Sequence, residues 1–288
     1  LSLELGQNLL AENNDFKLII DNEEDLAGLP PSVIDAAADE AKNSGNEGKW
    51  VFTLAKPSWI PFLQFSERRD LREKLYRAYY MRGDNNNKTD NKKPFIELMQ
   101  LRQKMAEILG YKNYAEYFIS DQMAKTPENV YEFLYKVWEP SIARAKSERD
   151  ELQAIIDREG NGFQLESWDW WYYAELVRKE KYDLNEDELK QYLTLDNVRE
   201  GIFKLTNNLY GLTYQKRTDV PVYHPEVEAF EVKDNDGSHL GLLFIDPHPR
   251  PGKRGGAWCG TYRRKKKKNG ERVSPIVTMV MNFTRPTE

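Results

Sequence analysis

The chain has 288 residues, 40% of them hydrophobic and 12% aromatic, so it carries enough large apolar side chains to fill a sizeable core and is not a disordered chain. Its 42 Lys and Arg residues against 47 Asp and Glu residues give a net charge of −5, which leaves no global positive field to hold nucleic acid or an anionic membrane. The single cysteine, Cys259, excludes an internal disulfide framework and a four-cysteine zinc site. No apolar run approaches the roughly 18 residues that span a bilayer. We therefore expect a soluble, cytoplasmic protein that binds neither nucleic acid nor membrane.

Hydrophobic spacing predicts helices along most of the chain. Gly83 and Gly110 follow two amphipathic segments and are typical helix stops. Thr126 followed by Pro127 is a typical helix start, because the threonine side chain can cap the first turn and proline lacks only an N–H that is unpaired there anyway. Helices are expected at about 67–82, 93–109, 126–158, 167–181, 185–193 and 196–210, with one short strand at 50–54.

After Pro221 the spacing of hydrophobic residues changes from the helical period to the alternation typical of strands. Turn signals, Asp234 to Gly237 and the pair Asn269-Gly270, separate alternating segments. Strands are expected at about 226–233, 240–246, 257–262 and 273–283. The predicted fold class is mainly α, a multi-helix scaffold with a small C-terminal antiparallel β-meander. The predicted domains are a helical scaffold over residues 1–220 and a small sheet over residues 221–288.

The usual catalytic and metal-binding motifs are absent from the sequence. There is no glycine-rich phosphate loop and no nucleophile elbow. The three histidines, His224, His239 and His248, are isolated, so none forms the His-Glu-x-x-His pair that places two imidazoles on one helix face. We expect His224 to be a packed, hydrogen-bonded residue and His239 and His248 to lie in turns. No catalytic residue and no metal ligand is predicted.

Three further features each allow two interpretations. The six cations from Arg263 to Lys268 precede the Asn269-Gly270 turn and are interpreted as a solvated hairpin tip, in preference to a nucleic-acid patch, because no aromatic residue follows in the loop to stack a base. Trp168, Trp171 and Tyr172 share one helix face, which indicates core packing more often than a ligand cage.

The third feature is a pair of glycines at the start of a predicted strand. Gly255 and Gly256, followed by Ala257 and Trp258, leave no side chain to keep another backbone away. Such an edge can accept a peptide as an extra strand. The alternative is a β-bulge or a tight corner of the sheet.

Several segments together resemble the thimet oligopeptidase and peptidyl-dipeptidase family of zinc metallopeptidases. The resemblance rests on three motifs in the same order and at similar spacing, with weaker similarity at 24–30 and 109–115, so it covers essentially the whole chain. The motifs are Asp-Trp-Trp-Tyr-Tyr-Ala-Glu at 169–175, Pro-Val-Tyr-His-Pro-Glu-Val at 221–227 and Lys-Arg-Gly-Gly-Ala-Trp at 253–258. The Tyr223-His224-Pro225 form and the Trp-rich stretch are closer to the bacterial peptidyl-dipeptidases, which remove C-terminal dipeptides, than to the oligopeptidases.

The resemblance implies a mostly helical channel for short unstructured peptides, with a small sheet beside a zinc ion. Family members hold the zinc with a His-Glu-x-x-His helix and a later glutamate, and the motif glutamate activates the bound water. None of those residues is present here. In the family that helix follows soon after the strand that resembles residues 275–283.

We therefore interpret the chain as a fragment of a zinc metallopeptidase. It begins at Leu1 without an initiator Met or a signal segment and stops at Glu288, and both ends are interpreted as cuts. Zinc is expected in the full-length parent and not in these 288 residues, which are predicted to be inactive alone. The expected partners are short unstructured peptides and the C-terminal part of the same polypeptide, without which the helices should expose large apolar patches. The alternatives are an oligopeptidase of the same family and a non-catalytic peptide-binding module.

The resemblance also implies which residues contact the peptide. The segment Gly255, Gly256, Ala257 and Trp258 resembles the strand with which family members pair the substrate backbone, a contact that is indifferent to most side chains. These four residues are the predicted substrate-binding site.

Overall fold

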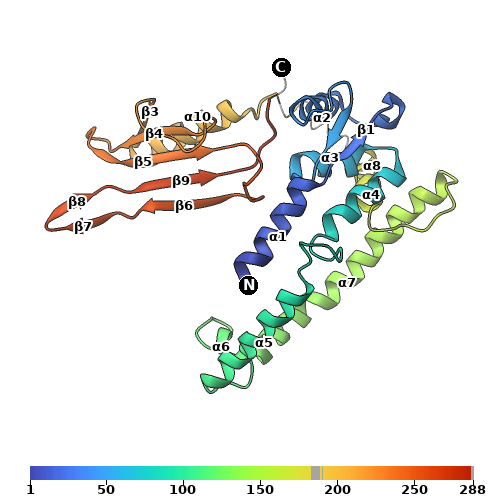
Figure 1. The fold of residues 1–288 in the computed structure, drawn as a ribbon, viewed down its shortest axis with the longest axis horizontal. Helices are drawn as coiled ribbons and strands as arrows, with labels where there is room; N and C mark the ends of the chain where they lie inside the picture. The colour runs from blue at the N-terminus through green and yellow to red at the C-terminus, as the bar shows by residue number, and fades with distance from the viewer. Residues whose placement is uncertain (183–188, 190, 287–288) are drawn as a thin grey trace. The chain divides into compact units, whose positions relative to one another are not determined.

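The computed structural model describes residues 1–182, 189 and 191–286, and these fold into two compact units. The first contains Leu1–Leu54 and Ser58–Val177, and the second contains Ala55–Pro57 and the chain from Arg178 onward. The first is helical apart from one small strand pair, and the second is built on a sheet (Figure 1). The predicted fold class, mainly α with a small sheet, is confirmed.

Helices make up most of the first unit. Their bounds are α1 Ser2–Asp15, α2 Pro31–Asn43, α3 Lys56–Phe65, α4 Arg69–Tyr80, α5 Lys92–Ile108, α6 Tyr114–Ile119, α7 Pro127–Arg158 and α8 Trp170–Tyr182, with a 3₁₀ turn at Glu23–Leu26. The start of α3, before Ser58, and the end of α8, after Val177, belong to the second unit. The predicted stops Gly83 and Gly110 follow α4 and α5 with φ of 76° and 82°, a left-handed conformation that glycine adopts without strain. Thr126 caps α7 as predicted, since its side chain accepts a hydrogen bond from the amide of Asn129.

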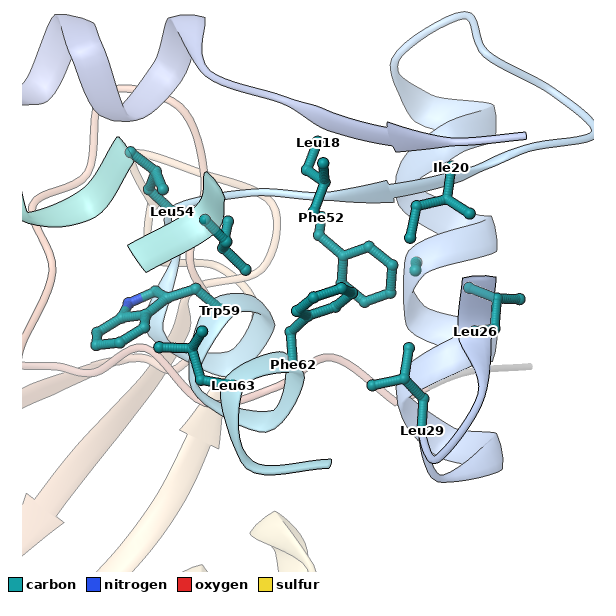
Figure 2. Packing of buried hydrophobic residues seen from close by; sticks show 11 residues of the cluster. Leu18, Ile20, Leu26, Leu29, Phe52, Leu54, Trp59, Phe62 and Leu63 are labelled. Atoms are coloured by element: carbon teal, nitrogen blue, oxygen red, sulfur yellow. The ribbon is translucent and has the colours of Figure 1, made fainter. Parts of the chain in front are cut away.

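The core of the first unit lies between a strand pair and α3. Strands β1 (Leu18–Ile20) and β2 (Trp50–Phe52) pair antiparallel, which confirms the predicted strand near residue 50. Phe52 on β2 meets Phe62 on α3 with ring centroids 4.6 Å apart, and both are buried (Figure 2). Each fully buried aromatic or aliphatic side chain of this kind stabilises the fold by about 1.5–3 kcal/mol.

The aromatic cluster before and within α8 belongs to the packing of the first unit. Trp171 meets the buried Trp59 edge-on at 6.0 Å, and Tyr172 lies against a second buried cluster. Between Trp168 and Trp170, the fully buried Asp169 accepts hydrogen bonds from Arg69 at 2.9 Å and Arg72 at 3.0 Å. These contacts agree with the core interpretation of the tryptophans.

A five-stranded sheet forms the centre of the second unit, in the order β3-β4-β5-β9-β6. A separate two-stranded hairpin, β7-β8, extends from the ends of β6 and β9 (Figure 1). The strand bounds are β3 Thr213–Arg217, β4 Glu228–Lys233, β5 His239–Asp246, β6 Trp258–Arg263, β7 Lys266–Lys268, β8 Glu271–Val273 and β9 Ile276–Val280. Both predicted hairpin turns are present, with positive φ at Gly237, Asn269 and Gly270.

The sheet is not a simple antiparallel meander, and that detail of the prediction is wrong. Strand β9 lies between β5 and β6 and pairs with β5 in parallel, with Phe244 opposite Thr278. The alternation of hydrophobic residues did not reveal this order. The loop after β5 places β6 one strand away from β5, and β9 then inserts between them. The sheet also begins with β3, before Pro221. A domain boundary at residues 220 and 221 stays a prediction.

One helix covers a face of the sheet. Helix α10 (Leu195–Tyr210) stacks Phe203 on Tyr214 of β3 at 3.9 Å and meets Phe230 of β4 at 5.2 Å. Its end at Gly211, with φ of 72°, is as predicted. The predicted helix at 185–193 falls largely on residues outside those that the structure describes.

Candidate functional site

The four predicted substrate-binding residues lie at an edge of the sheet. Gly255, Gly256 and Ala257 lead directly into β6, which Trp258 begins, and β6 is the last strand in the sheet order. Among the described residues no strand pairs with its outer side. Trp258 is 42% exposed, and most of β6 is exposed with it. An edge of this kind presents unpaired backbone N–H and C=O groups and can accept an additional strand.

The two glycines give this edge open space. A Cβ atom placed on Gly255 or Gly256 would meet no atom within 4 Å, and Gly256 has a φ of 100°, which side chains of L-residues rarely tolerate. The register irregularity of β6 lies further along, between Thr261 and Arg263. The bulge that was one alternative interpretation of the glycines is therefore elsewhere in the strand. The other alternative, a tight corner, agrees with the bend at Gly255 and Gly256 just before β6, and peptide binding at these residues stays a prediction.

A buried ionic cluster anchors the loop that leads to this edge. Asp246, the last residue of β5, accepts two hydrogen bonds from Arg250, at 2.7 and 2.8 Å, and one from Lys253 at 2.8 Å. The Tyr223 hydroxyl donates to the same carboxylate at 3.0 Å. Lys253 also donates to the backbone carbonyl of His248 at 2.6 Å and is only 4% exposed. The loop thus folds back onto the end of β5.

The cluster perturbs the titration of its members. Burial alone would raise the pKa of Asp246, but the bonds from Arg250, Lys253 and Tyr223 hold it well below its usual range. Burial lowers the pKa of Lys253, against the opposing effect of its bond to Asp246. Burial, followed by the hydrogen bond to Asp246, raises the pKa of Tyr223 to about 12. At neutral pH the tyrosine is a neutral donor and Asp246 an ionised acceptor.

A second contact holds the glycine segment itself. The side-chain amide of Asn282, just after β9, donates to the backbone carbonyls of Gly256 at 2.6 Å and Arg254 at 3.1 Å. Sequence reasoning missed both Asn282 and the Asp246 cluster. Lys253 stands inside the Lys-Arg-Gly-Gly-Ala-Trp motif and was the available signal, because a lysine so close to an apolar strand needs an anionic partner.

The histidines do not converge on one another. Glu226 donates its backbone N–H to Nδ1 of His224 at 3.3 Å, so His224 is hydrogen-bonded as predicted. Nδ1 of His248, in the loop after β5, lies 3.2 Å from the carbonyl oxygen of Phe283. The prediction for His239 is wrong: it is the first residue of β5, 2.9 Å from Glu231 on β4, because the strand extends one residue closer to the turn.

The residues present do not fit a zinc site. Within the described part of the chain, no group of three or more His, Cys, Asp or Glu side chains is arranged to hold a metal ion. The whole sequence contains no His-Glu-x-x-His. A search of the described helices for one long and apolar enough to cross a membrane found none.

Comparison with known proteins identifies the family to which this chain belongs. Residues 62–288 match the profile of peptidase family M3, and the chain belongs to this family. The family resemblance seen in the sequence is thereby confirmed.

Individual relatives are bacterial and plant peptidases. The dipeptidyl carboxypeptidase of Escherichia coli (strain K12) is 37% identical over 287 residues, which are 99% of this chain and 42% of the relative. Oligopeptidase A of Salmonella typhimurium is 32% identical over 99% of this chain and 43% of its own length. The organellar oligopeptidase A of Arabidopsis thaliana is 33% identical over 99% of this chain and 38% of its own length. The chain thus spans about two fifths of the length of the curated relatives it matches.

Proposed function

We propose that this chain is part of a zinc peptidase that releases C-terminal dipeptides from short unstructured peptides. The observation that carries the proposal is the similarity to a dipeptidyl carboxypeptidase along 99% of the chain. The residues that bind zinc are proposed to lie on polypeptide outside these 288 residues, because the sequence has no His-Glu-x-x-His and the relatives are more than twice as long. We place the protein in the cytoplasm, where a single exposed cysteine stays reduced.

The part assigned to this chain is to hold the peptide. Gly255, Gly256, Ala257 and Trp258 are proposed to pair with the substrate backbone along the outer side of β6. Backbone pairing needs no particular side chain on the peptide, so it supports broad sequence tolerance. The open space at the two glycines favours the close approach of a second backbone. These four residues are assigned no catalytic step, because none of them is an acidic or histidine side chain that could bind zinc.

The test compares two proteins, the 288-residue chain and the longer polypeptide of the same gene. Each is assayed on a quenched fluorescent peptide with a free C-terminus, with and without added zinc, and its zinc content is measured after dialysis. We expect the longer protein to bind zinc and release a C-terminal dipeptide, and the chain alone to do neither. Stoichiometric zinc in the chain alone, or activity from it, would contradict the proposal.

The same assay separates two alternatives. An oligopeptidase, favoured by the similarity to oligopeptidase A, would cleave an internal bond of a C-terminally amidated peptide, which a peptidyl-dipeptidase should leave intact because it needs a free C-terminus. A non-catalytic peptide-binding module would show neither zinc nor cleavage in the longer protein while still binding peptide.

A further inference from the structure

The hairpin β7-β8 concentrates positive charge on a chain that is negative overall. Residues 263–273 carry seven cationic side chains and one carboxylate, Glu271, against a net charge of −5 for the whole chain. All of β7 is exposed. Lys267 pairs directly with Arg272 across the hairpin, a like-charge pair that destabilises a strand ladder.

One of these cations has an opposite charge across the hairpin, since Lys268 lies opposite Glu271 in the strand register, and the others face no carboxylate there. In the part of the chain that the structure describes, Arg264, Lys265, Lys266, Lys267 and Lys268 form no ion pair. By contrast, Arg217 and Arg250 in the same unit each bind a carboxylate. A cluster of unpaired like charges lowers its own repulsion when an external anionic group binds it. The hairpin is therefore complementary to an acidic partner.

The position of the hairpin indicates which partner fits. Strand β7 follows β6 after two residues and continues beyond it on the same outer side, while β8 leads back into β9 (Figure 1). A strand added along the outer side of β6 would therefore run on beside Lys266, Lys267 and Lys268. From Trp258 to Lys268 this track is as long as a peptide of about eleven residues, at about 3.3 Å per residue.

We infer that the hairpin selects peptides whose N-terminal part is acidic. This rests on the proposed function, because it requires the peptide to lie along β6. Antiparallel pairing, the commoner arrangement in sheets, sets the peptide's C-terminal part beside Gly256 and Trp258 and its N-terminal part beside β7. Carboxylates in that N-terminal part then lie within reach of the three lysines of β7. An extended peptide is the partner argued for because the open edge of β6 leads directly into the hairpin, and residues 263–273 themselves carry no aromatic side chain on which a base could stack. The exposed Tyr262 just before them makes nucleic acid an outcome that the test must distinguish.

The test uses three labelled peptides of about twelve residues with the same central sequence, a length that covers this track at about 3.3 Å per residue. One has Asp and Glu in its N-terminal third, one has them in its C-terminal third, and one has Asn and Gln in both. Binding to the 288-residue chain is measured by fluorescence anisotropy at low and at high salt. We expect the N-terminally acidic peptide to bind about tenfold more tightly than the neutral one at low salt, with the difference lost at high salt.

The hairpin variant is K266Q/K267Q/K268Q. It should abolish the preference for the acidic peptide and leave binding of the neutral peptide unchanged. Its matched control, K17Q/K88Q/K104Q, removes the same number of charges from exposed positions of the first unit and should keep the preference. Because the substituted side chains are exposed, both variants should unfold at the temperature of the parent chain.

The outcomes separate the two proposals. Equal binding of acidic and neutral peptides, or preference for the C-terminally acidic one, overturns the role of the hairpin while leaving the peptide edge intact. Failure of the neutral peptide to bind at all contradicts the proposed peptide edge. A single-stranded oligonucleotide that binds more tightly than the acidic peptide, and loses its affinity in the hairpin variant, identifies nucleic acid as the partner and overturns the inference.

Discussion

At the scale of single residues, Asp246 is the common acceptor of the hydrogen bonds that hold the loop before the candidate edge. It ends β5, its side chain is 2% exposed, and it receives hydrogen bonds from Tyr223, Arg250 and Lys253. A buried carboxylate without such partners would cost several kcal/mol, so the bonds make its burial possible. The residues that bind Asp246 are also those that set the course of the loop into β6.

We predict that D246N destabilises the protein by about 3 kcal/mol at pH 7, because it leaves two buried cations facing a neutral amide. The folded-state pKa of Asp246 is depressed, so its stabilisation is complete above the unfolded-state pKa, about 4, and is lost as the pH falls below it. Urea unfolding at several pH values should show the difference between parent and variant narrowing below about pH 4. A gap that stays constant down to pH 2 would show that the charge of Asp246 is not the cause. K204Q, an exposed change on α10, serves as control and should cost less than about 0.5 kcal/mol.

Tyr223 gives a prediction at the alkaline end. Its folded-state pKa is raised to about 12, so the neutral hydroxyl stabilises the fold below about pH 10 and this contribution is lost as the pH rises through 12. Y223F removes one hydrogen bond to a charged acceptor, but Tyr223 is 48% exposed and water screens the contact, so the change should cost about 0.5–1.5 kcal/mol at pH 7. Parent and variant should converge in stability above pH 10, as judged by denaturant unfolding. If they stay equally far apart at pH 11, the hydrogen bond to Asp246 does not explain the loss.

At the scale of elements, the loop from 247 to 257 depends on its two neighbours, β5 and the segment after β9. Backbone N–H groups of Met281 and Phe283 donate to the carbonyls of Asp246 and Pro247, both at 2.8 Å. Asn282, between them, binds the carbonyl of Gly256. The segment that follows β9 therefore holds both the start and the end of this loop.

N282A should loosen the glycine segment without unfolding the sheet. Losing hydrogen bonds worth about 0.5–1.5 kcal/mol each lowers the population of the binding-competent loop, so the neutral peptide should bind about 3–10-fold more weakly. The matched control is N207A, which removes a side-chain bond to the carbonyl of Leu212 at the end of α10 and should leave peptide affinity unchanged. Equal affinities for parent and N282A would mean that the observed loop geometry does not determine binding.

At the scale of the whole molecule, the first part of α7 stands out because it buries nothing. Its buried residues, Leu152, Ile155 and Ile156, all lie near its C-terminal end. Upstream, Phe133 is 67% exposed, and Leu134 and Trp138 are at least half exposed. This agrees with the expectation that the chain alone exposes apolar surface. Contiguous apolar patches of this sort are typical of surfaces that contact other protein.

We predict that the chain self-associates through this helix at high concentration. Self-association is measured by analytical ultracentrifugation, and exposed apolar surface by the fluorescence of a dye that binds such surfaces. The double variant L134E/W138E places charge on adjacent turns of one face and should lower both the sedimentation-derived mass and the dye binding. Its unfolding free energy should stay within about 0.5 kcal/mol of the parent value, since both side chains are exposed. S147E, which adds charge on the same helix without removing apolar surface, should not change self-association. A parent chain that stays monomeric and binds no dye would contradict the prediction.

Features that depend only on neighbours along the chain could be predicted from the residues alone. Helix ends at Gly83 and Gly110, the cap at Thr126 and the Asn269-Gly270 turn were all predictable, because each is fixed by the conformational preference of one or two residues. The family was equally recognisable, since its motifs are short and contiguous. An open edge was one of two interpretations of the glycine pair, and the exposure of β6 became evident only from its place at the end of the strand order.

Contacts between residues far apart along the chain became known from the folded structure. Asp169 binds Arg69 across 100 positions, the Asp246 side chain has partners in two segments, at Tyr223 and in the loop after β5, and β9 enters the sheet beside β5. These contacts depend on how the whole chain closes its loops. The local spacing of hydrophobic residues carries no information on the free energy of that closure. The anchored loop and the basic hairpin beside the edge are therefore properties of the folded sheet, even though every residue in them can be read in the sequence.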